Sequence, residues 1–105
     1  MKEQYTQDKL LEILQEVEDP ELGYSIVDLG LVYRAEQVED HIEVDFTLTY
    51  FGCPLGGMLE QEIVQTLRAA TGIKDVRVRV MWNPPWTIEM ASPEVRLDLG
   101  YPVSL

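Results

Sequence analysis

Cys53 is the residue whose type and setting point most directly to chemistry. It is the only cysteine in the sequence, and it stands in the run Gly52-Cys53-Pro54, which Gly56 and Gly57 follow closely. Proline suits the first position of a helix, so the thiol is expected at or near a helix N-cap. The positive end of a helix dipole stabilises a thiolate and thereby lowers the pKa of a thiol placed there. Because a thiolate is both a nucleophile and a metal ligand, we expect Cys53 to be reactive.

The alternative for Cys53 is a buried small hydrophobic residue, which is what most free cysteines are. The glycines around it offer little apolar surface for packing, and strand-to-helix connections are where α/β proteins often place their sites. In favour of the buried residue, no Lys, Arg or His is near Cys53 in the sequence, and the negative net charge opposes a thiolate. Both interpretations stay open, with the reactive thiol ahead.

Acidic residues around Pro20 are the second candidate group. Asp19 and Glu21 flank this proline at the expected end of the first helix, where acids are electrostatically unfavourable. They would orient a thiol, a proton or a metal, or else they form an ordinary Asp-Pro turn. Asp28 either caps a turn, which base rates favour, or points into the same cleft.

Other familiar site motifs are missing from the sequence. His41 is the only histidine, and we expect it to be solvated in a polar hairpin turn. Without a second His or Cys nearby, an intrachain zinc site of the Cys/His type is disfavoured, and so is a Ser-His-Asp triad. The run from Gly52 to Gly56 lacks the spacing and the lysine of a phosphate-binding loop.

Trp82 and Trp86 bracket the dipeptide Pro84-Pro85 in the C-terminal part of the chain. This rigid aromatic segment is either a cleft wall or a partner-binding surface, since tryptophan is favoured at interfaces, or a strap that covers the core. The sequence does not separate these alternatives.

The elements that must position these residues follow from hydrophobic periodicity and from helix-end signals. We expect the order α-β-β-α-β plus a short C-terminal helix. The expected elements are a helix capped by Thr6 and ended by Pro20, strands at 31–35 and 42–49, a helix from Pro54 to Gly72, a strand at 76–80, and a helix from Ser92 to Leu99.

The first two strands should form an antiparallel hairpin, and the third should run parallel to the second through a right-handed crossover. The fold class is therefore α/β (α+β), with a mixed sheet packed against helices. If the last two strands are neighbours, Glu43 and Asp45 should lie near Arg77 and Arg79. We expect residues 1–105 to form a single compact domain with its core at 10–100.

Charge and composition limit the classes of function. Eight basic and nineteen acidic residues give a net charge of −11, which disfavours nucleic acids and anionic membrane surfaces as partners. The charge serves solubility or, alternatively, docking to a basic partner. One cysteine allows no intramolecular disulfide, and neither a signal peptide nor a long apolar run is visible, so we expect a cytoplasmic protein.

Five motifs in one order resemble the SufT/PaaD-like family of metal–sulfur cluster assembly factors, with the single-domain form closer to the SufT branch. The likeness covers Leu10 to Gly100. The motifs are Asp19-Pro20-Glu21, Val27-Asp28-Leu29-Gly30-Leu31-Val32-Tyr33, Thr47-Leu48-Thr49, Gly52-Cys53-Pro54-Leu55-Gly56-Gly57-Met58 and Trp82-Asn83-Pro84-Pro85-Trp86.

The resemblance implies a role in maturing iron–sulfur proteins, with the iron–sulfur assembly machinery and client apoproteins as partners. It also implies that Cys53 is the reactive cysteine, in a pocket with Asp19, Glu21 and Thr49. Tyr50 and Phe51 stand where many relatives carry Thr and Pro. The pocket wall beside the cysteine is therefore expected to be bulkier and more aromatic here.

Ligand counting then narrows the role of Cys53. An iron–sulfur cluster usually takes four protein thiolates, and this chain supplies one, its only metal-ligand candidate. A transient cluster or iron would be shared with a second copy, a partner or a small thiol, and no cofactor is intrinsic. A homodimer is one option, because hairpin edges pair easily.

Three hypotheses follow. The favoured one is a transfer adaptor for iron–sulfur assembly, which is not an enzyme. The second is a thiol enzyme that uses Cys53 as nucleophile or persulfide carrier, with Asp19 or Glu21 handling the proton. The third is a structural interaction module in which the segment from Trp82 to Trp86 makes the contact.

Overall fold

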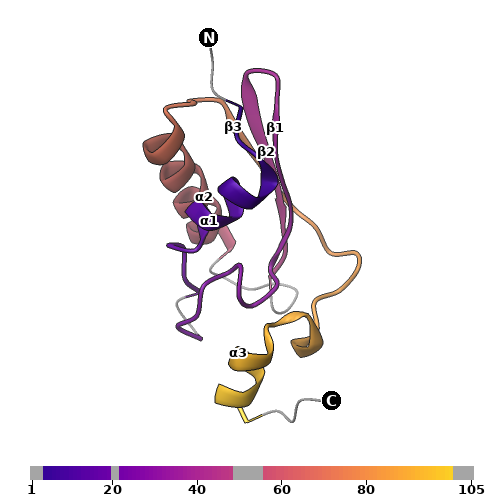
Figure 1. The fold of residues 1–105 in the computed structure, drawn as a ribbon. Coiled ribbons are helices and arrows are strands. Elements are labelled where there is room, and N and C mark those ends of the chain that lie inside the picture. The colour runs from indigo at the N-terminus through magenta and orange to yellow at the C-terminus, as the bar shows by residue number, and fades with distance from the viewer. Residues whose placement is uncertain (1–3, 20–21, 49–55, 101–105) are drawn as a thin grey trace.

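The computed structural model describes residues 4–19, 22–48 and 56–100, and a three-stranded mixed sheet lies at its centre (Figure 1). The predicted α-β-β-α-β order, the final helix and the mixed sheet are confirmed, and one 3-10 turn is additional. The elements are α1 (Gln7–Leu14), β1 (Val32–Val38), β2 (His41–Phe46), α2 (Gly56–Thr71), β3 (Val76–Val80), the 3-10 turn η1 (Ile88–Met90) and α3 (Pro93–Asp98).

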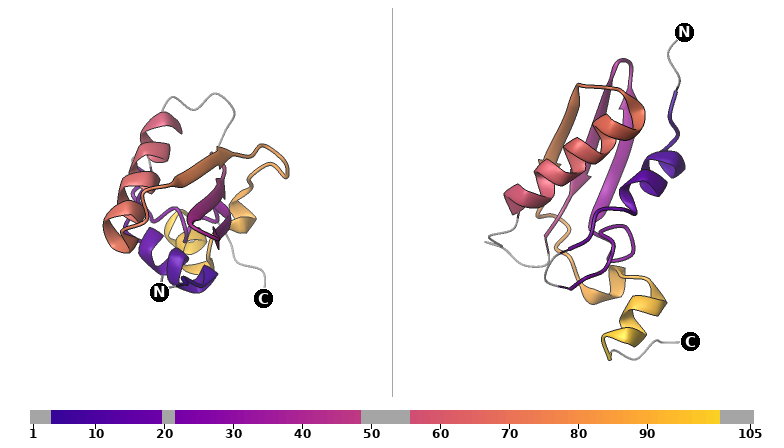
Figure 2. Two further views of the ribbon diagram at one scale, coloured as in Figure 1. Left: turned by 90° about the horizontal axis from the view of Figure 1, so that it is seen from above. Right: turned by 90° about the vertical axis from the view of Figure 1, so that its left-hand side faces the viewer.

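The sheet has the order β1-β2-β3, with β2 antiparallel to β1 and parallel to β3. Helices α1 and α2 pack on the same face of the sheet, α1 against β1 and α2 against β3 (Figure 2). On that face β2 buries three side chains completely, because apolar residues alternate along a strand with one covered face. They are Ile42, Val44 and Phe46.

Helix α1 begins where expected and ends early. Thr6 is its N-cap and accepts a hydrogen bond from the Lys9 amide at 3.1 Å. The helix ends at Leu14, so the prediction that it continues to Pro20 was wrong. Residues 17–19 instead pair with residues 24–26, and the Ile26 amide donates to the Val17 carbonyl at 2.9 Å. We call these two paired segments the clasp.

The loop of residues 25–31 lies inside the molecule, and the segment of residues 81–92, which we call the strap, is bonded to it. Ile26, Leu29 and Leu31 are fully buried in the loop. The Trp86 indole Nε1 donates to the Leu29 carbonyl at 2.6 Å, and the Ser92 amide donates to the Asp28 carbonyl at 2.8 Å. These bonds hold η1 and α3 at the end of the sheet away from the β1–β2 turn (Figure 1).

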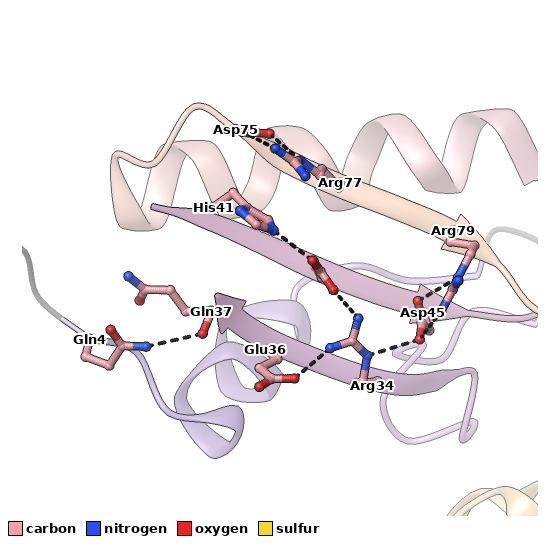
Figure 3. A network of polar contacts seen from close by, with 10 residues as sticks. Gln4, Arg34, Glu36, Gln37, His41, Asp45, Asp75, Arg77 and Arg79 are labelled. Carbon is pink, nitrogen blue, oxygen red and sulfur yellow. Dashed lines mark hydrogen bonds and ion pairs between the residues drawn. The ribbon is translucent and has the colours of Figure 1, made fainter. Parts of the chain in front are cut away.

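The face of the sheet opposite the helices carries an ion-pair network centred on Arg34 (Figure 3). Its guanidinium contacts the carboxylates of Glu36, Glu43 and Asp45. The strand register sets Glu36 directly opposite Glu43, an arrangement that is repulsive by itself. Arg34 bridges the two acids and removes that repulsion.

The predicted neighbourhood of acids on β2 and arginines on β3 is confirmed by the register, which aligns Glu43 with Arg77 and Asp45 with Arg79. Arg79 bonds Asp45 through Nε at 3.2 Å and Nη2 at 3.1 Å. Arg77 departs from the prediction, because its ion pair is with Asp75 two residues earlier on the same strand segment.

His41 was expected to be solvated in a turn, and that prediction was wrong. It is the first residue of β2, and its side chain is only 15% exposed. Its Nε2 lies 2.7 Å from Oε2 of Glu43. This contact, together with Arg34, lowers the pKa of the Glu43 carboxyl.

Asp45 is the buried acid of the network. Burial by itself would raise the pKa of its carboxyl, but hydrogen bonds from Arg79 and Arg34 outweigh burial and lower that pKa. A carboxyl whose pKa is lower in the folded chain contributes stability above its unfolded pKa and loses it as the pH falls through its folded pKa. The network therefore favours folding at neutral pH and is lost in acid.

We predict that Asp45→Asn lowers the free energy of unfolding by about 1–2 kcal/mol at neutral pH. Below pH ~4, the ordinary carboxyl range, the variant should lose less further stability than the original chain. Urea unfolding across this pH range measures both effects. The control Asp75→Asn breaks an exposed pair and should cost under about 0.5 kcal/mol. Equal acid sensitivity of Asp45→Asn and the original chain would contradict the assignment.

A second prediction concerns Gly30, which has a φ of 74° and lies under the strap. A Cβ placed there would overlap the Met90 carbonyl oxygen and lie 2.7 Å from its carbon. Gly30→Ala should therefore cost about 2–4 kcal/mol, combining backbone strain with the clash. Gly72→Ala is the matched control, because Gly72 has a φ of 77° with nothing within 4 Å. Equal losses of melting temperature in the two variants would show that the strap contact is unimportant.

Candidate functional site

The candidate site lies at the end of the sheet where β2 ends and α2 begins. Cys53 and Thr49 belong to segment 49–55, and Glu21 to segment 20–21, so all three fall outside the described residues. Asp19 and the last residues before segment 49–55 are described. The Thr47 amide donates to the Leu31 carbonyl of the buried loop at 2.8 Å, and the Asp19 amide donates to the Tyr24 carbonyl at 2.9 Å, within the clasp that adjoins this loop.

Asp19 is buried and shapes the turn at the tip of the clasp. It is 5% exposed, and its Oδ1 accepts a hydrogen bond from the Leu22 amide at 3.2 Å. Its carbonyl also accepts from the Gly23 amide at 2.7 Å, where Gly23 has a φ of 76°. These bonds run from Asp19 to amides three and four residues later in the chain. They place the Asp19 carboxylate at the entrance to the segment that contains Glu21.

Thr47 is a buried polar residue of this region. Strand alternation put it on the polar face, yet it is completely buried. Its Oγ1 has no hydrogen-bond partner among the described residues. A buried hydroxyl without a partner is costly, so it needs a reason. The Thr47-Leu48-Thr49 motif was the available signal, since it sets a hydroxyl residue two positions before Thr49.

The first turn of α2 is open to solvent. Gly57 is exposed, and a Cβ there would meet nothing within 4 Å. Met58 is 50% exposed, and the first turn contains no acidic residue. The first backbone N–H groups of a helix have no partners within the helix and attract negative charge. This end of α2 therefore presents that positive end with no carboxylate of its own to neutralise it.

The two tryptophans of the strap lie in different environments. Trp86 packs against the core and bonds the Leu29 carbonyl, as a core-covering strap would. Trp82 is 41% exposed. Tyr33 forms a β-bulge in β1, and its hydroxyl donates to the Pro84 carbonyl at 2.7 Å, which fastens the strap between the tryptophans. Partner binding by Trp82 and Trp86 stays a prediction.

Asp28 contributes to the same end of the molecule through two bonds. Its Oδ1 accepts from the Gln15 side chain at 3.2 Å, and its carbonyl accepts from the Ser92 amide. The carboxylate thus links the end of α1 to the buried loop.

Within residues 4–19, 22–48 and 56–100, no group of three or more His, Cys, Asp and Glu residues could hold a metal ion. An open hollow of about 230 Å³ lies on the sheet face lined by the Arg34 network. Three arginines and two carboxylates line it, together with Val78. In the same ranges, no helix has the length and apolar character that crossing a bilayer requires.

Comparison with known proteins identifies close relatives. A Bacillus subtilis protein named Fe-S protein maturation auxiliary factor YitW is 38% identical, covering 93% of this chain and 97% of its own. The Staphylococcus aureus Fe-S protein maturation auxiliary factor SufT is 41% identical, covering 78% of this chain and 94% of its own.

Solved structures agree with the sequence relatives. The crystal structure of a domain of unknown function, DUF59, from Bacillus anthracis superimposes with a TM-score of 0.85 and 36% identity, covering 90% of this chain and 91% of that one. The family described as "Iron-sulfur cluster assembly protein" matches residues 7–80, a range that includes Cys53. The chain therefore belongs to this iron–sulfur cluster assembly family, in its SufT/PaaD-like group.

Proposed function

We propose that this chain is a maturation factor for iron–sulfur proteins and acts as a transfer adaptor through Cys53. The observation that carries the proposal is the family match over residues 7–80. Two relatives, each covered over more than nine-tenths of its length, bear names that state iron–sulfur protein maturation. We extend the same role to the domain with its core at residues 10–100, acting in the cytoplasm with the assembly machinery and client apoproteins.

The described ends of segment 49–55 support Cys53 as the reacting group. On one side the chain leaves the core at Leu48, which is 6% exposed, and on the other it enters the open first turn of α2 at Gly56. A thiolate near such a helix start is stabilised by the dipole.

The single cysteine favours transfer over storage. A cluster usually needs four thiolates, and this chain has one. The cluster, its iron or its sulfur is therefore cargo in this proposal, held jointly with the thiols of a donor or a client. One thiolate gives a weak hold, which lets the cargo move on to an apoprotein with a complete set of ligands.

Asp19, Glu21 and Thr49 complete the proposed pocket. The buried Asp19 carboxylate accepts a hydrogen bond from the Leu22 amide. We assign Asp19 a positioning role on this ground. Glu21 and Thr49 are included in the pocket because the family resemblance implies them.

A thiol enzyme is the second candidate, favoured by the open, acid-free first turn of α2. In that case Cys53 carries a persulfide or acyl group, and its thiolate must be abundant at neutral pH. An adaptor needs Cys53 only as a ligand for its cargo, so it does not require an abundant thiolate at neutral pH.

We predict that Cys53→Ser abolishes function in cells. In a strain that lacks the gene, the original chain should restore the activity of iron–sulfur enzymes under iron limitation and oxidative stress, and Cys53→Ser should leave it at the level of the deletion. Met58→Leu, a change at an exposed position in the first turn of α2, is the control and should restore activity fully. Full activity with Cys53→Ser would exclude both hypotheses that need the thiol and leave the structural interaction module as the remaining one.

We also predict that the Cys53 thiol titrates below a free thiol, whose pKa is about 8.5. The measurement is the rate of alkylation by iodoacetamide against pH, on the purified chain without reductant. Since this is the only cysteine, all alkylation reports on it. A midpoint at or above that of a free thiol would exclude the activated nucleophile and leave the adaptor as the candidate.

A further inference from the structure

Positive charge is concentrated in one stretch of this acidic chain. Residues 63–88 contain four of the eight basic residues and one of the nineteen acidic ones, which gives this stretch a charge of +3. The remaining residues carry −14, so the molecule has two electrostatically different parts. The stretch contains the second half of α2, all of β3 and the start of the strap.

The fold brings these four basic residues to one edge of the molecule. Arg68, in the last turn of α2, donates from Nε to the Lys74 carbonyl at 2.8 Å, which joins the helix end to the start of β3. Arg77 and Arg79 project from β3 on the open face of the sheet, with side chains 62% and 65% exposed (Figure 3).

The strand that carries them is an edge strand. β3 pairs with β2 on one side, and in the described part of the chain no strand pairs with its other side. The Ile42 amide donates to the Asp75 carbonyl and the Met81 amide to the Phe46 carbonyl, so odd-numbered residues of this segment face β2. By the alternation of a parallel ladder, the N–H and C=O groups of Val76, Val78 and Val80 point outward.

The arginines of this edge have capacity for a second carboxylate. Arg77 bonds Asp75, and Arg79 bonds Asp45, each through Nε and Nη2. A guanidinium has five N–H donors, so these pairs do not use all of them. Asp75 is itself 53% exposed, which makes its ion pair with Arg77 weak and easily shared.

A second copy of this chain does not suit the edge. Antiparallel pairing of two β3 strands would set Arg77 and Arg79 of one copy against those of the other, and directly opposed like charges are destabilising. Charged residues on an edge strand are a common protection against such self-pairing. The same residues select for a strand of opposite charge.

We propose that the outer edge of β3 binds an extended acidic segment of a partner protein, which adds to the sheet as a fourth strand. Main-chain hydrogen bonds to Val76, Val78 and Val80 would provide the pairing. Side chains of a strand alternate between its faces, so acids at every second position of the segment would lie beside Arg77 and Arg79. Lys74 and Arg68 extend the positive charge toward the start of β3.

This docking surface goes beyond the proposed function, because it uses neither Cys53 nor segment 49–55. It supplies a way for an acidic chain to recognise partners despite its net charge of −11. A partner segment on this edge would share the sheet with β2, whose continuation leads toward Cys53.

The test uses the full chain labelled with nitrogen-15 and a capped nine-residue peptide that alternates glutamate with threonine. Adding the peptide should move the amide signals of Val76, Val78 and Val80 in a saturable manner, and raising the salt concentration should weaken binding. A peptide with glutamine in place of glutamate should bind at least tenfold more weakly.

Two charge-reversal variants distinguish binding at the β3 edge from a general effect of the net charge. Arg77→Glu should weaken binding of the glutamate peptide at least fivefold. Lys9→Glu makes the same change of charge on α1, where the Lys9 side chain is 54% exposed, and should change binding less than twofold. Cys53→Ser should bind as the original chain does, so a failure here and a failure of the proposed function are distinguishable.

Four outcomes would overturn the proposal: no movement of the three valine amides at millimolar peptide, equal binding of the glutamine peptide, equal weakening by Lys9→Glu and Arg77→Glu, or a concentration-dependent shift of those amides without peptide. The last outcome would identify a second copy of the chain as the occupant of the edge.

Discussion

The structure depends on satisfying the backbone of a loop that lies inside the protein. Residues 25–31 are not part of a helix or strand, yet they bury Ile26, Leu29 and Leu31 completely. Buried carbonyl groups without partners are costly. Here they accept hydrogen bonds from the continuation of β2, from the strap and from the cap residue of α3. One loop thereby ties together elements that are distant in the sequence.

That loop also explains why a reactive group suits this end of the molecule. The clasp with Asp19 and the end of β2 with Thr47 are both bonded to it, so two flanks of the proposed pocket share one rigid support. The first turn of α2 adds backbone N–H groups at an exposed helix start. A thiolate held among such groups needs no neighbouring cation, which is consistent with the absence of Lys, Arg and His near Cys53 in the sequence.

Local patterns predicted the helices and strands well. Where a helix or strand packs one face against the core, its apolar residues recur at regular spacing in the sequence. The alternation around Val44 and the caps Thr6 and Ser92 indicated β2, α1 and α3, and the structure confirms them. The same patterns did not predict which polar side chains are buried by contacts with other parts of the chain.

Turn propensity placed His41 in solvent, but its side chain contacts Glu43, and Thr47 is completely buried. The early end of α1 has a similar cause, since clasp pairing competes with the helix for the backbone of residues 17–19. For the candidate site, sequence reasoning pointed to Asp19, whose role stays a prediction, and missed the buried hydroxyl of Thr47. Both depend on the distant loop, which no local pattern reveals.

The Arg34 network affects which substitutions at these positions the protein should tolerate. Glu36 and Glu43 face each other across the hairpin, and Arg34 contacts both of them as well as Asp45, which Arg79 also bonds. A mutation that removes Arg34 first leaves Glu36 and Glu43 in direct repulsion, whereas the same mutation should be milder once one of these two acids has gone. We therefore expect substitutions at these positions to be tolerated better in one order than in the other. Lysine is a poor intermediate on such a route, because a point charge does not reproduce the planar fork of a guanidinium.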